Sequence, residues 1–264
     1  MNPWGPVFVP PERLSIGPFS VYLYSLFLLV GIVAGYYLAR PEAKRRGISA
    51  ERLQVSLLYG VVPGLIGARL YHVIDRWDLY AAEPLQALAI WNGGLAIFGG
   101  LAGGAFGLWL FARHQQRNFL TVLDVWAPGV LAAQAIGRLG NWANQEAFGP
   151  PTDAPWGVFI DELHRPSVYS FDTHFHPAFL YESALAVVGI LVLLQIRKRF
   201  GSRPGTVLGA YLITYGIIRF VVEFFRFDTA ETLGIATAHI IAVAIAGLGV
   251  ALLLRPSGRR KAAG

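Results

Sequence analysis

The chain contains no cysteine and very little charge. None of its 264 residues is a cysteine, and only 14% are Asp, Glu, Lys or Arg, against about 25% in soluble proteins. The missing thiols exclude a disulfide framework, a cysteine nucleophile and a cysteine metal site. The low charge, set beside 55% apolar residues, leaves too little polar surface for a soluble domain of this size. We therefore predict an integral membrane protein.

Several common catalytic motifs are also missing. The sequence has no H-E-x-x-H, no G-x-S-x-G and no P-loop, which counts against a zinc protease, a serine hydrolase and a nucleotide-driven protein. Nothing suggests a metal or an organic cofactor. Residues 1–13 hold four prolines and no basic segment ahead of an apolar core, so we expect the first apolar run to be a retained span and no cleavable signal.

Apolar segments long enough to cross a bilayer recur along the whole chain. A membrane-spanning helix needs about 20 mostly apolar residues. Seven segments qualify: 14–39, 53–74, a stretch within 84–112, 120–138, 177–196, 204–225 and 233–254. The predicted fold is an all-α polytopic membrane protein with seven transmembrane helices, forming one domain over residues 1–264. Residues 139–176 form the longest non-spanning segment, which we expect to be an external loop or arm rich in aromatic side chains.

The basic residues alternate between the two sides of these spans. Of the 22 Lys and Arg residues, 15 follow the first, third, fifth and seventh spans. The positive-inside rule then places the N-terminus outside and the C-terminus in the cytoplasm. The same distribution explains the net charge of +6 by anchoring near anionic lipid, and it argues against nucleic-acid binding because no basic stripe with interleaved aromatics occurs.

One cluster of polar residues lies near the end of the sixth span. Tyr215, Arg219, Glu223 and Arg226 follow one another at steps of four, four and three residues, which places them on one helical face. An internal Arg–Glu pair with Arg226 extending to the interface is one interpretation. An anion site is the other, because guanidinium groups suit phosphate oxygens.

A second cluster, from Gly137 to Gly149, follows the fourth span and contains an arginine, two asparagines, a glutamine and a glutamate. It is either a polar cap where a helix meets water or a functional site, and its density of hydrogen-bonding groups favours function. A third, glycine-rich stretch covers residues 91–104. Its four-residue spacing is typical of close helix packing in membranes, and an approach path for lipid or peptide is the alternative.

Three further features have both a structural and a functional interpretation. His176 opens the fifth span and is more typical of a structural hydrogen bond than of a base. Arg69, inside the second span, is expected to pair with a carboxylate. Tyr22 and Tyr24, in the first span, are candidates for interfacial aromatics.

These motifs together resemble the prolipoprotein diacylglyceryl transferase family. The resemblance covers most of the chain, and the Gly137–Gly149 block is its most specific element. The other matching motifs are Trp91-Asn92-Gly93-Gly94, His176-Pro177 with Tyr181-Glu182, and Tyr215-Gly216 with Arg219-Phe220 and Glu223-Phe224-Phe225-Arg226.

The resemblance implies a transferase of the bacterial cytoplasmic membrane with its active site toward the external face. Such an enzyme moves the diacylglyceryl group of phosphatidylglycerol to the lipobox cysteine thiol of a prolipoprotein signal peptide, giving a thioether and glycerol phosphate. The implied partners are these two substrates and membrane lipid, with no nucleic acid. The implied catalytic residues are Arg138, Arg219, Glu146 and Glu223. The implied phosphatidylglycerol-binding residues are Arg138, Asn141, Gly149, Tyr22, Tyr215, Arg219 and Arg226.

One position departs from the family pattern. Many members carry a histidine, proposed to deprotonate the thiol, where this chain has Phe98. Glu146, Glu223 and His176 are alternative bases, and thiolate formation beside two arginines, which lowers a cysteine pKa, is the explanation that we favour.

The rival classes are a transporter or channel with an arginine-lined anion path, a lipid-binding protein without turnover, and an intramembrane protease. The clustering of charge toward one side and the lack of an internal repeat argue against transport, and the lack of a nucleophile motif argues against a protease.

Overall fold

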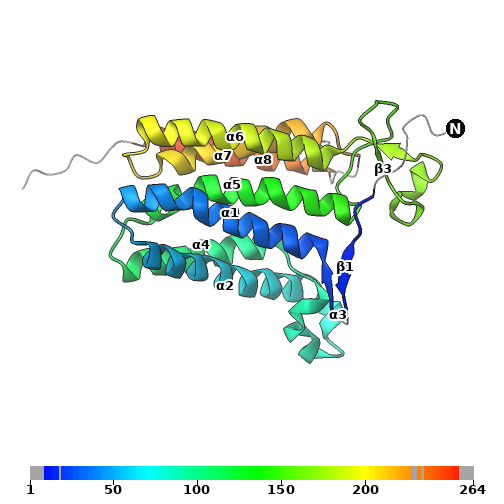
Figure 1. The fold of residues 1–264 in the computed structure, drawn as a ribbon, viewed down its shortest axis with the longest axis horizontal. Coiled ribbons are helices and arrows are strands. Elements are labelled where there is room, and N and C mark those ends of the chain that lie inside the picture. The colour runs from blue at the N-terminus through cyan, green and yellow to red at the C-terminus, as the bar shows by residue number, and fades with distance from the viewer. Residues whose placement is uncertain (1–8, 18, 228–230, 233–234, 256–264) are drawn as a thin grey trace, which may run out of the picture. The chain divides into compact units, whose positions relative to one another are not determined.

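The computed structural model describes residues 9–17, 19–227, 231–232 and 235–255, and in these segments the chain is mainly helical (Figure 1). The α-helices are α1 Leu23–Arg45, α2 Ala50–Asp75, α3 Trp77–Tyr80, α4 Ile97–His114, α5 Phe119–Ala143, α6 Ala178–Phe200, α7 Thr206–Glu223 and α8 Thr237–Leu254. The strands form three two-stranded antiparallel ribbons: β1 Arg13–Ile16 with β2 Phe19–Tyr22, β3 Val158–Phe159 with β4 His174–Phe175, and β5 Glu231–Thr232 with β6 Ile235–Ala236.

Six of these helices have the length and composition of membrane spans: α1, α2, α5, α6, α7 and α8. Helix α4 is not among them. Much of the charge-free run from 84 to 112 is not α-helical, because residues before α4 form two short 3-10 helices, Pro84–Leu88 and Ile90–Asn92. What remains is an 18-residue helix that carries Arg113 and His114 in its last turn. The polytopic all-α prediction is thus confirmed in its coarse form, without the count of seven.

The first predicted span begins later than expected. Residues 14–16 and 19–22, which were assigned to it, belong to the two strands of a β-hairpin in which Arg13 pairs with Tyr22 and Ser15 with Ser20. Gly17 lies in the turn with φ of 61°, a left-handed backbone that glycine adopts readily. The absence of charge does not distinguish a hairpin from a helix, so hydropathy alone placed the start of the span too early. The helix begins at Leu23. The seventh span begins at Thr237, and residues 233–234, assigned to it by sequence, lie outside the described residues.

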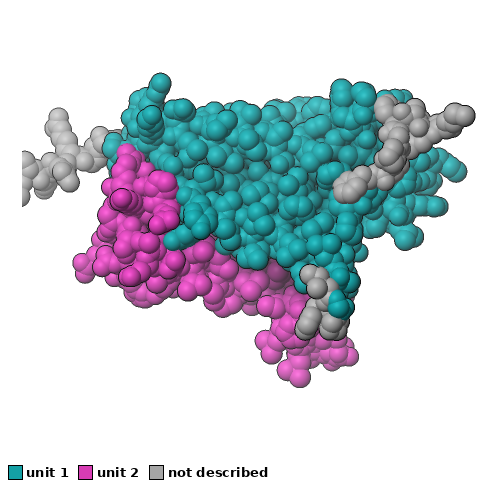
Figure 2. Space-filling view, viewed as in Figure 1, with its two compact units in different colours: residues 1–39, 126–264 teal, residues 40–125 magenta. Residues whose placement is uncertain are grey.

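The chain divides into two compact units (Figure 2), residues 40–125 and residues 1–39 with 126–264. Organisation as one domain over 1–264 stays a prediction. In the unit 40–125, α2 and α4 pack closely through glycines: a Cβ at Gly64 would lie 3.3 Å from the Gly100 carbonyl oxygen, and one at Gly103 would reach the Pro63 carbonyl. The packing interpretation of the glycine-rich stretch is therefore confirmed for its α4 part.

Arg69 lies in the same unit and does not pair with a carboxylate, contrary to expectation. Its side chain, 8% exposed, donates to main-chain carbonyl groups of the 3-10 segment. The acceptors are Ala87 O (2.8 Å), Gly93 O (2.6 Å), Gly94 O (3.0 Å), Gln86 O (2.6 Å) and Ala89 O (3.4 Å). A short irregular segment leaves many main-chain carbonyl groups without hydrogen-bond donors. The Arg69 guanidinium, with five N–H donors, binds these carbonyl groups and therefore needs no carboxylate partner.

The unit formed by 1–39 and 126–264 contains most of α1 and α5 and all of α6, α7 and α8. Gly35 of α1 approaches α5, since a Cβ at Gly129 would lie 2.6 Å from the Gly35 carbonyl oxygen. Ser183 of α6 donates to the Ala135 carbonyl of α5 at 2.9 Å. Helices α7 and α8 meet at Gly209, where a Cβ would lie 3.0 Å from the Gly249 carbonyl oxygen. Helix α6 also contacts α7 and α5, since a Cβ at Gly189 would lie 2.6 Å from Thr214 Cγ2 and 3.0 Å from Leu131 Cδ2, so α5, α6 and α7 pack together.

The segment between α5 and α6 is a small folded arm. Helix α5 continues to Ala143, so the first five residues of the predicted 139–176 loop are helical. The rest contains β3 and β4, and Phe148, Ile160 and Phe175 of this arm form a core with Phe179 of α6. Figure 1 shows β3 at the end of this unit where α5 ends and α6 begins.

Candidate active site

An ion pair between α5 and α6 forms the centre of the site. Arg138 Nη2 lies 2.5 Å from Glu182 Oε1, and the Glu182 side chain is 6% exposed. Both residues lie within apolar helices, where an unpaired charge would be strongly unfavourable. The Arg138 side chain is 26% exposed, so it is accessible to a ligand while Glu182 fixes its direction.

A chain of hydrogen bonds continues from Arg138 into the loop after α5. Arg138 Nη1 donates to Asn141 Oδ1 at 3.3 Å, and Asn141 Nδ2 donates to Glu146 Oε1 at 2.8 Å. The same carboxylate oxygen accepts Asn144 Nδ2 at 3.2 Å. The loop is held in an unusual backbone conformation, with φ of 50° at Gln145 and 58° at Ala147. Left-handed conformations at residues with a side chain are disfavoured and concentrate at functional sites.

The loop is fastened to the arm by Gln145. This side chain is 8% exposed, and its Oε1 accepts the main-chain N–H of Asp161 at 2.5 Å. The Gly137–Gly149 cluster is therefore a built network of side chains, and the simple polar-cap interpretation does not account for its bonds to α6 and to the arm.

Helix α7 brings a second arginine into the same unit. Arg219 Nη2 lies 2.7 Å from Glu223 Oε2, and the glutamate side chain is 3% exposed. This confirms the predicted internal pair at a spacing of four residues. Tyr215, one turn earlier, lies within electrostatic range of Arg219, Arg138 and Glu182, so the phenol belongs to the same cluster as the two ion pairs.

Arg226 follows the end of α7 at Glu223, so it does not continue the helical face as predicted. Burial, followed by the positive charge of Arg219, lowers the pKa of Arg226. Glu223, Arg138 and Glu182 also act on it, which shows that Arg226 still belongs to this cluster. The cluster holds three guanidinium groups, the two buried carboxylates of Glu182 and Glu223, and the exposed carboxylate of Glu146. Because water screens an exposed charge most, the buried part of the cluster is net positive, which suits an anionic ligand.

A tight contact joins the loop to the end of α7. A Cβ at Gly149 would meet the Phe225 carbonyl oxygen and lie 3.0 Å from His176 Cβ, so no side chain fits there. The Gly149 N–H donates to the His176 carbonyl at 2.8 Å. His176 Nδ1 lies 3.0 Å from the Tyr181 hydroxyl, which also accepts Trp156 Nε1–H at 2.8 Å. These contacts support the structural interpretation of His176.

Two tyrosines of the N-terminal segment differ in their surroundings. Tyr22, predicted to bind substrate, lies in β2, and its hydroxyl accepts a hydrogen bond from Arg13, whose guanidinium lies 4.1 Å from the ring centroid. Among the described residues no hydrogen bond joins Tyr22 to Arg138 or Arg219. Tyr24 in α1 instead packs against α5, since a Cβ at Gly140 would lie 2.5 Å from Tyr24 Cδ2.

Sequence analysis gave no site role to Glu182, the partner of Arg138. Two signals pointed to it: it is the single charge in an apolar span, which indicates a buried partner, and it belongs to the Tyr181-Glu182 motif of the family resemblance. The stack of Tyr211 on Tyr215, with centroids 6.2 Å apart, was also missed. The Tyr211 hydroxyl donates to Gln134 Oε1 of α5 at 3.3 Å, which adds a tie between α5 and α7.

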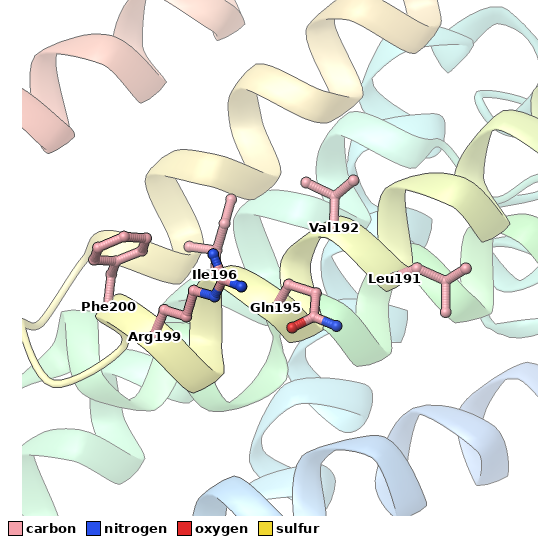
Figure 3. Close-up of a pocket in the computed structure, with 6 residues that line it drawn as sticks. All are labelled: Leu191, Val192, Gln195, Ile196, Arg199 and Phe200. Atoms are coloured by element: carbon pink, nitrogen blue, oxygen red, sulfur yellow. The ribbon is translucent and has the colours of Figure 1, made fainter.

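Two surface grooves lie elsewhere in this unit. One, of about 380 Å³, is lined by the C-terminal part of α6, as Figure 3 shows: Leu191, Val192, Gln195, Ile196, Arg199 and Phe200. At 1.5 Å rise per residue, it begins about 14 Å and ends about 27 Å along the helix from Glu182, so it is not part of the candidate site. The other, of about 480 Å³, lies on the arm and is lined by Pro151, Thr152, Asp153, Phe171, Asp172, Thr173 and His174.

Comparisons with known proteins agree with the motifs. The model of the family described as prolipoprotein diacylglyceryl transferase matches residues 11–255. A phosphatidylglycerol–prolipoprotein diacylglyceryl transferase of Cutibacterium acnes is 38% identical over 94% of this chain and 85% of its own length. Proteins of the same name from Gloeobacter violaceus and Thermotoga maritima are each 38% identical, over 96% and 98% of this chain and 96% and 89% of their own lengths.

Proposed function

The chain belongs to the prolipoprotein diacylglyceryl transferase family, and we propose that its transfer site is the network around Arg138 and Arg219. The chain is a bacterial membrane enzyme of lipoprotein lipidation that transfers the diacylglyceryl group of phosphatidylglycerol to a prolipoprotein. The observation that supports this site is that Arg138 and Arg219 are each paired with a buried carboxylate, Glu182 and Glu223, with Arg226 within electrostatic range of both pairs.

The chemistry explains why arginines are required. The lipobox thiolate sulfur attacks the diacylglyceryl carbon next to the phosphate ester oxygen, a carbon–sulfur bond forms, and the carbon–oxygen bond breaks. The electron pair of that bond leaves with glycerol phosphate, so negative charge grows on the phosphate. Guanidinium donors fixed beforehand by Glu182 and Glu223 stabilise that charge without reorganising. Arg138 and Arg219 thus bind the phosphate, and Glu223 and Glu182 orient them.

The remaining predicted residues take supporting positions. Asn141 and Glu146 fix the loop beside Arg138, Tyr215 lies between the two ion pairs, and Gly149 lets the loop approach α7. Tyr22 binds the lipid at the N-terminal hairpin. The thiol proton leaves to water or to an exposed group, because the guanidinium field lowers the thiol pKa.

The proposed topology has seven spans, with α4 as the additional one, an external N-terminus and a cytoplasmic C-terminus. Arg197, Lys198 and Arg199 end α6, and Glu182 near its start then lies toward the external face, where the lipobox cysteine is accessible. The arm carries the external part of the site.

A transfer assay in liposomes tests the site. Wild type, Arg138→Ala and Arg219→Ala receive phosphatidylglycerol and a lipobox peptide, and the peptide mass is measured. Diacylglyceryl addition by wild type, with none from either folded variant, is the expected result. Undiminished transfer by both variants would contradict the assignment. Arg197→Ala is the matched control, because Arg197 donates to the Leu38 carbonyl at the other end of α6.

A further inference from the structure

Asn144 presents a buried hydrogen-bond acceptor without a donor. Its Oδ1 is one of two buried side-chain atoms in the described residues that lack a hydrogen-bond partner, the other being Glu223 Oε2. Glu223 Oε2 at least lies 2.7 Å from Arg219 in an ion pair, whereas no charge compensates Asn144 Oδ1. Buried polar atoms are nearly always paired in folded proteins, so each exception needs an explanation.

The orientation of the Asn144 amide is determined by its neighbour. Its Nδ2 donates to Glu146 Oε1 at 3.2 Å. Turning the amide over would place its oxygen against the carboxylate oxygen, so the nitrogen must face Glu146 and the oxygen must face away. Asn141 binds the same carboxylate oxygen at 2.8 Å and fixes it. The hydrogen bonds to Glu146 therefore keep Asn144 Oδ1 pointing away from this network, where it is available to accept a hydrogen bond.

The acceptor belongs to the network that carries Arg138. Arg138 donates to Asn141, Asn141 donates to Glu146, and Asn144 donates to the same Glu146 oxygen. A lipid whose phosphate lies on Arg138 would therefore place its head group near this end of the network. The phosphate diester and the two acyl esters of phosphatidylglycerol only accept hydrogen bonds, and the hydroxyls of its head-group glycerol are its only donors.

We propose that Asn144 Oδ1 accepts a hydrogen bond from a hydroxyl of the head-group glycerol and so selects the donor phospholipid. The proposal rests on the transfer site proposed above. Asn144 is then a specificity-determining residue. It binds the head-group glycerol, which leaves as part of glycerol phosphate. A site built around a substrate hydroxyl discriminates against the analogue without it, because the protein's polar atom is then left unpaired.

The test compares two donor lipids with the same acyl chains and phosphodiester. One is phosphatidylglycerol, and the other is phosphatidylpropanol, whose three-carbon head group has no free hydroxyl. The purified full chain in liposomes transfers from each to a lipobox peptide, and the ratio of the two kcat/KM values is measured. We expect wild type to prefer phosphatidylglycerol by about tenfold or more. In Asn144→Ala the preference should fall to about threefold or less, with transfer from phosphatidylpropanol retained.

Asn118→Ala is the matched control. Asn118 precedes the other end of α5, and its Oδ1 accepts the Leu120 N–H at 2.9 Å. Loss of this bond should lower the stability of the helix start and leave the lipid preference unchanged, which separates general destabilisation from recognition.

Three results would overturn the proposal: equal use of both lipids by wild type, a loss in Asn144→Ala that is the same for both lipids, or an effect confined to the KM of the peptide, which would assign the acceptor to a peptide N–H. If Asn144→Ala does not fold, Asn144→Ser replaces it: its hydroxyl is a donor compatible with Glu146 but is too short to reach the place of the amide oxygen, so the preference must fall in the same way. No transfer by wild type from any lipid would instead count against the transfer site itself.

Discussion

Arg138 on α5 and Glu182 on α6 form an ion pair with a distance of 2.5 Å between Nη2 and Oε1. The two residues are 44 positions apart in the sequence, and the whole arm lies between them. The pair therefore has two roles. It fixes the start of α6 against the end of α5, and it orients the Arg138 guanidinium beside the first residues of the arm.

The first prediction separates these two roles. Arg138→Met should abolish transfer and also destabilise the protein by about 3 kcal/mol or more, because it leaves Glu182 buried without a partner. The double variant Arg138→Met/Glu182→Leu removes both charges and should regain most of the lost stability. Thermal unfolding in detergent and the transfer assay measure the two properties.

The double variant should remain inactive, because no guanidinium is available for the phosphate. Recovery of activity together with stability would show that Arg138 serves only as a structural partner of Glu182.

The second prediction concerns the pH dependence of transfer. A free cysteine thiol has a pKa of about 8.5, and the thiolate fraction rises as pH rises toward that value. Nearby guanidinium groups lower the thiol pKa, so the rise in kcat/KM with pH should have its midpoint below about 8.5. Because Phe98 cannot accept a proton, this rise of kcat/KM with pH (the alkaline limb) should reflect the ionisation of the substrate thiol alone.

Single substitutions at the alternative bases provide the check. Glu146→Gln, Glu223→Gln and His176→Gln should lower the rate by different amounts while each keeps a rise of kcat/KM with pH, because none of them takes the proton. The two glutamate variants remove negative charge beside the arginines, so their midpoints should stay at or below that of wild type. Disappearance of the limb in one variant only would identify that residue as the base and contradict the electrostatic explanation.

The third prediction uses two glycines of the same motif. Gly149→Ala places a methyl group against the Phe225 carbonyl and His176, so the loop must move away from α7 and transfer should fall by about 100-fold, the effect of a displacement of roughly 1 Å at an active site. Gly137→Ala is the control, since nothing lies within 4 Å of its Cβ position.

Alanine at a helical glycine is favourable by about 0.5–1 kcal/mol. Gly137→Ala should therefore keep its activity and unfold at a slightly higher temperature. Equal losses in both variants would mean that the packing at Gly149 has no special role.

Periodicity and charge predicted the helices and the Arg219–Glu223 pair, because both depend on residues close in sequence. They did not predict the partner of Arg138, because the contact with Glu182 joins two helices and depends on the way that α5 and α6 pack. Hydropathy also misassigned residues 14–22, since a count of apolar residues does not distinguish a hairpin around Gly17 from the start of a span. The motif resemblance correctly identified the family, but it left the role of Asn144 unassigned.

The last prediction concerns the carbonyl-binding role of Arg69. A guanidinium reaches both edges of the 3-10 segment at once, with Nη1 on the Gly93 and Gly94 carbonyls and Nη2 on the Gln86 and Ala89 carbonyls. Lysine has a single ammonium group and cannot reproduce this fork. Arg69→Lys should therefore free most of these carbonyl groups and raise amide hydrogen exchange across residues 84–94.

Arg113→Lys is the matched control, because Arg113 ends α4 in the same unit and its guanidinium lies 5.7 Å from the Trp109 ring centroid. Lysine also binds an aromatic face, so exchange in residues 84–94 should not change. Unchanged exchange in Arg69→Lys as well would show that the segment is held by its own packing. In that case the five hydrogen bonds follow from its shape and do not cause it.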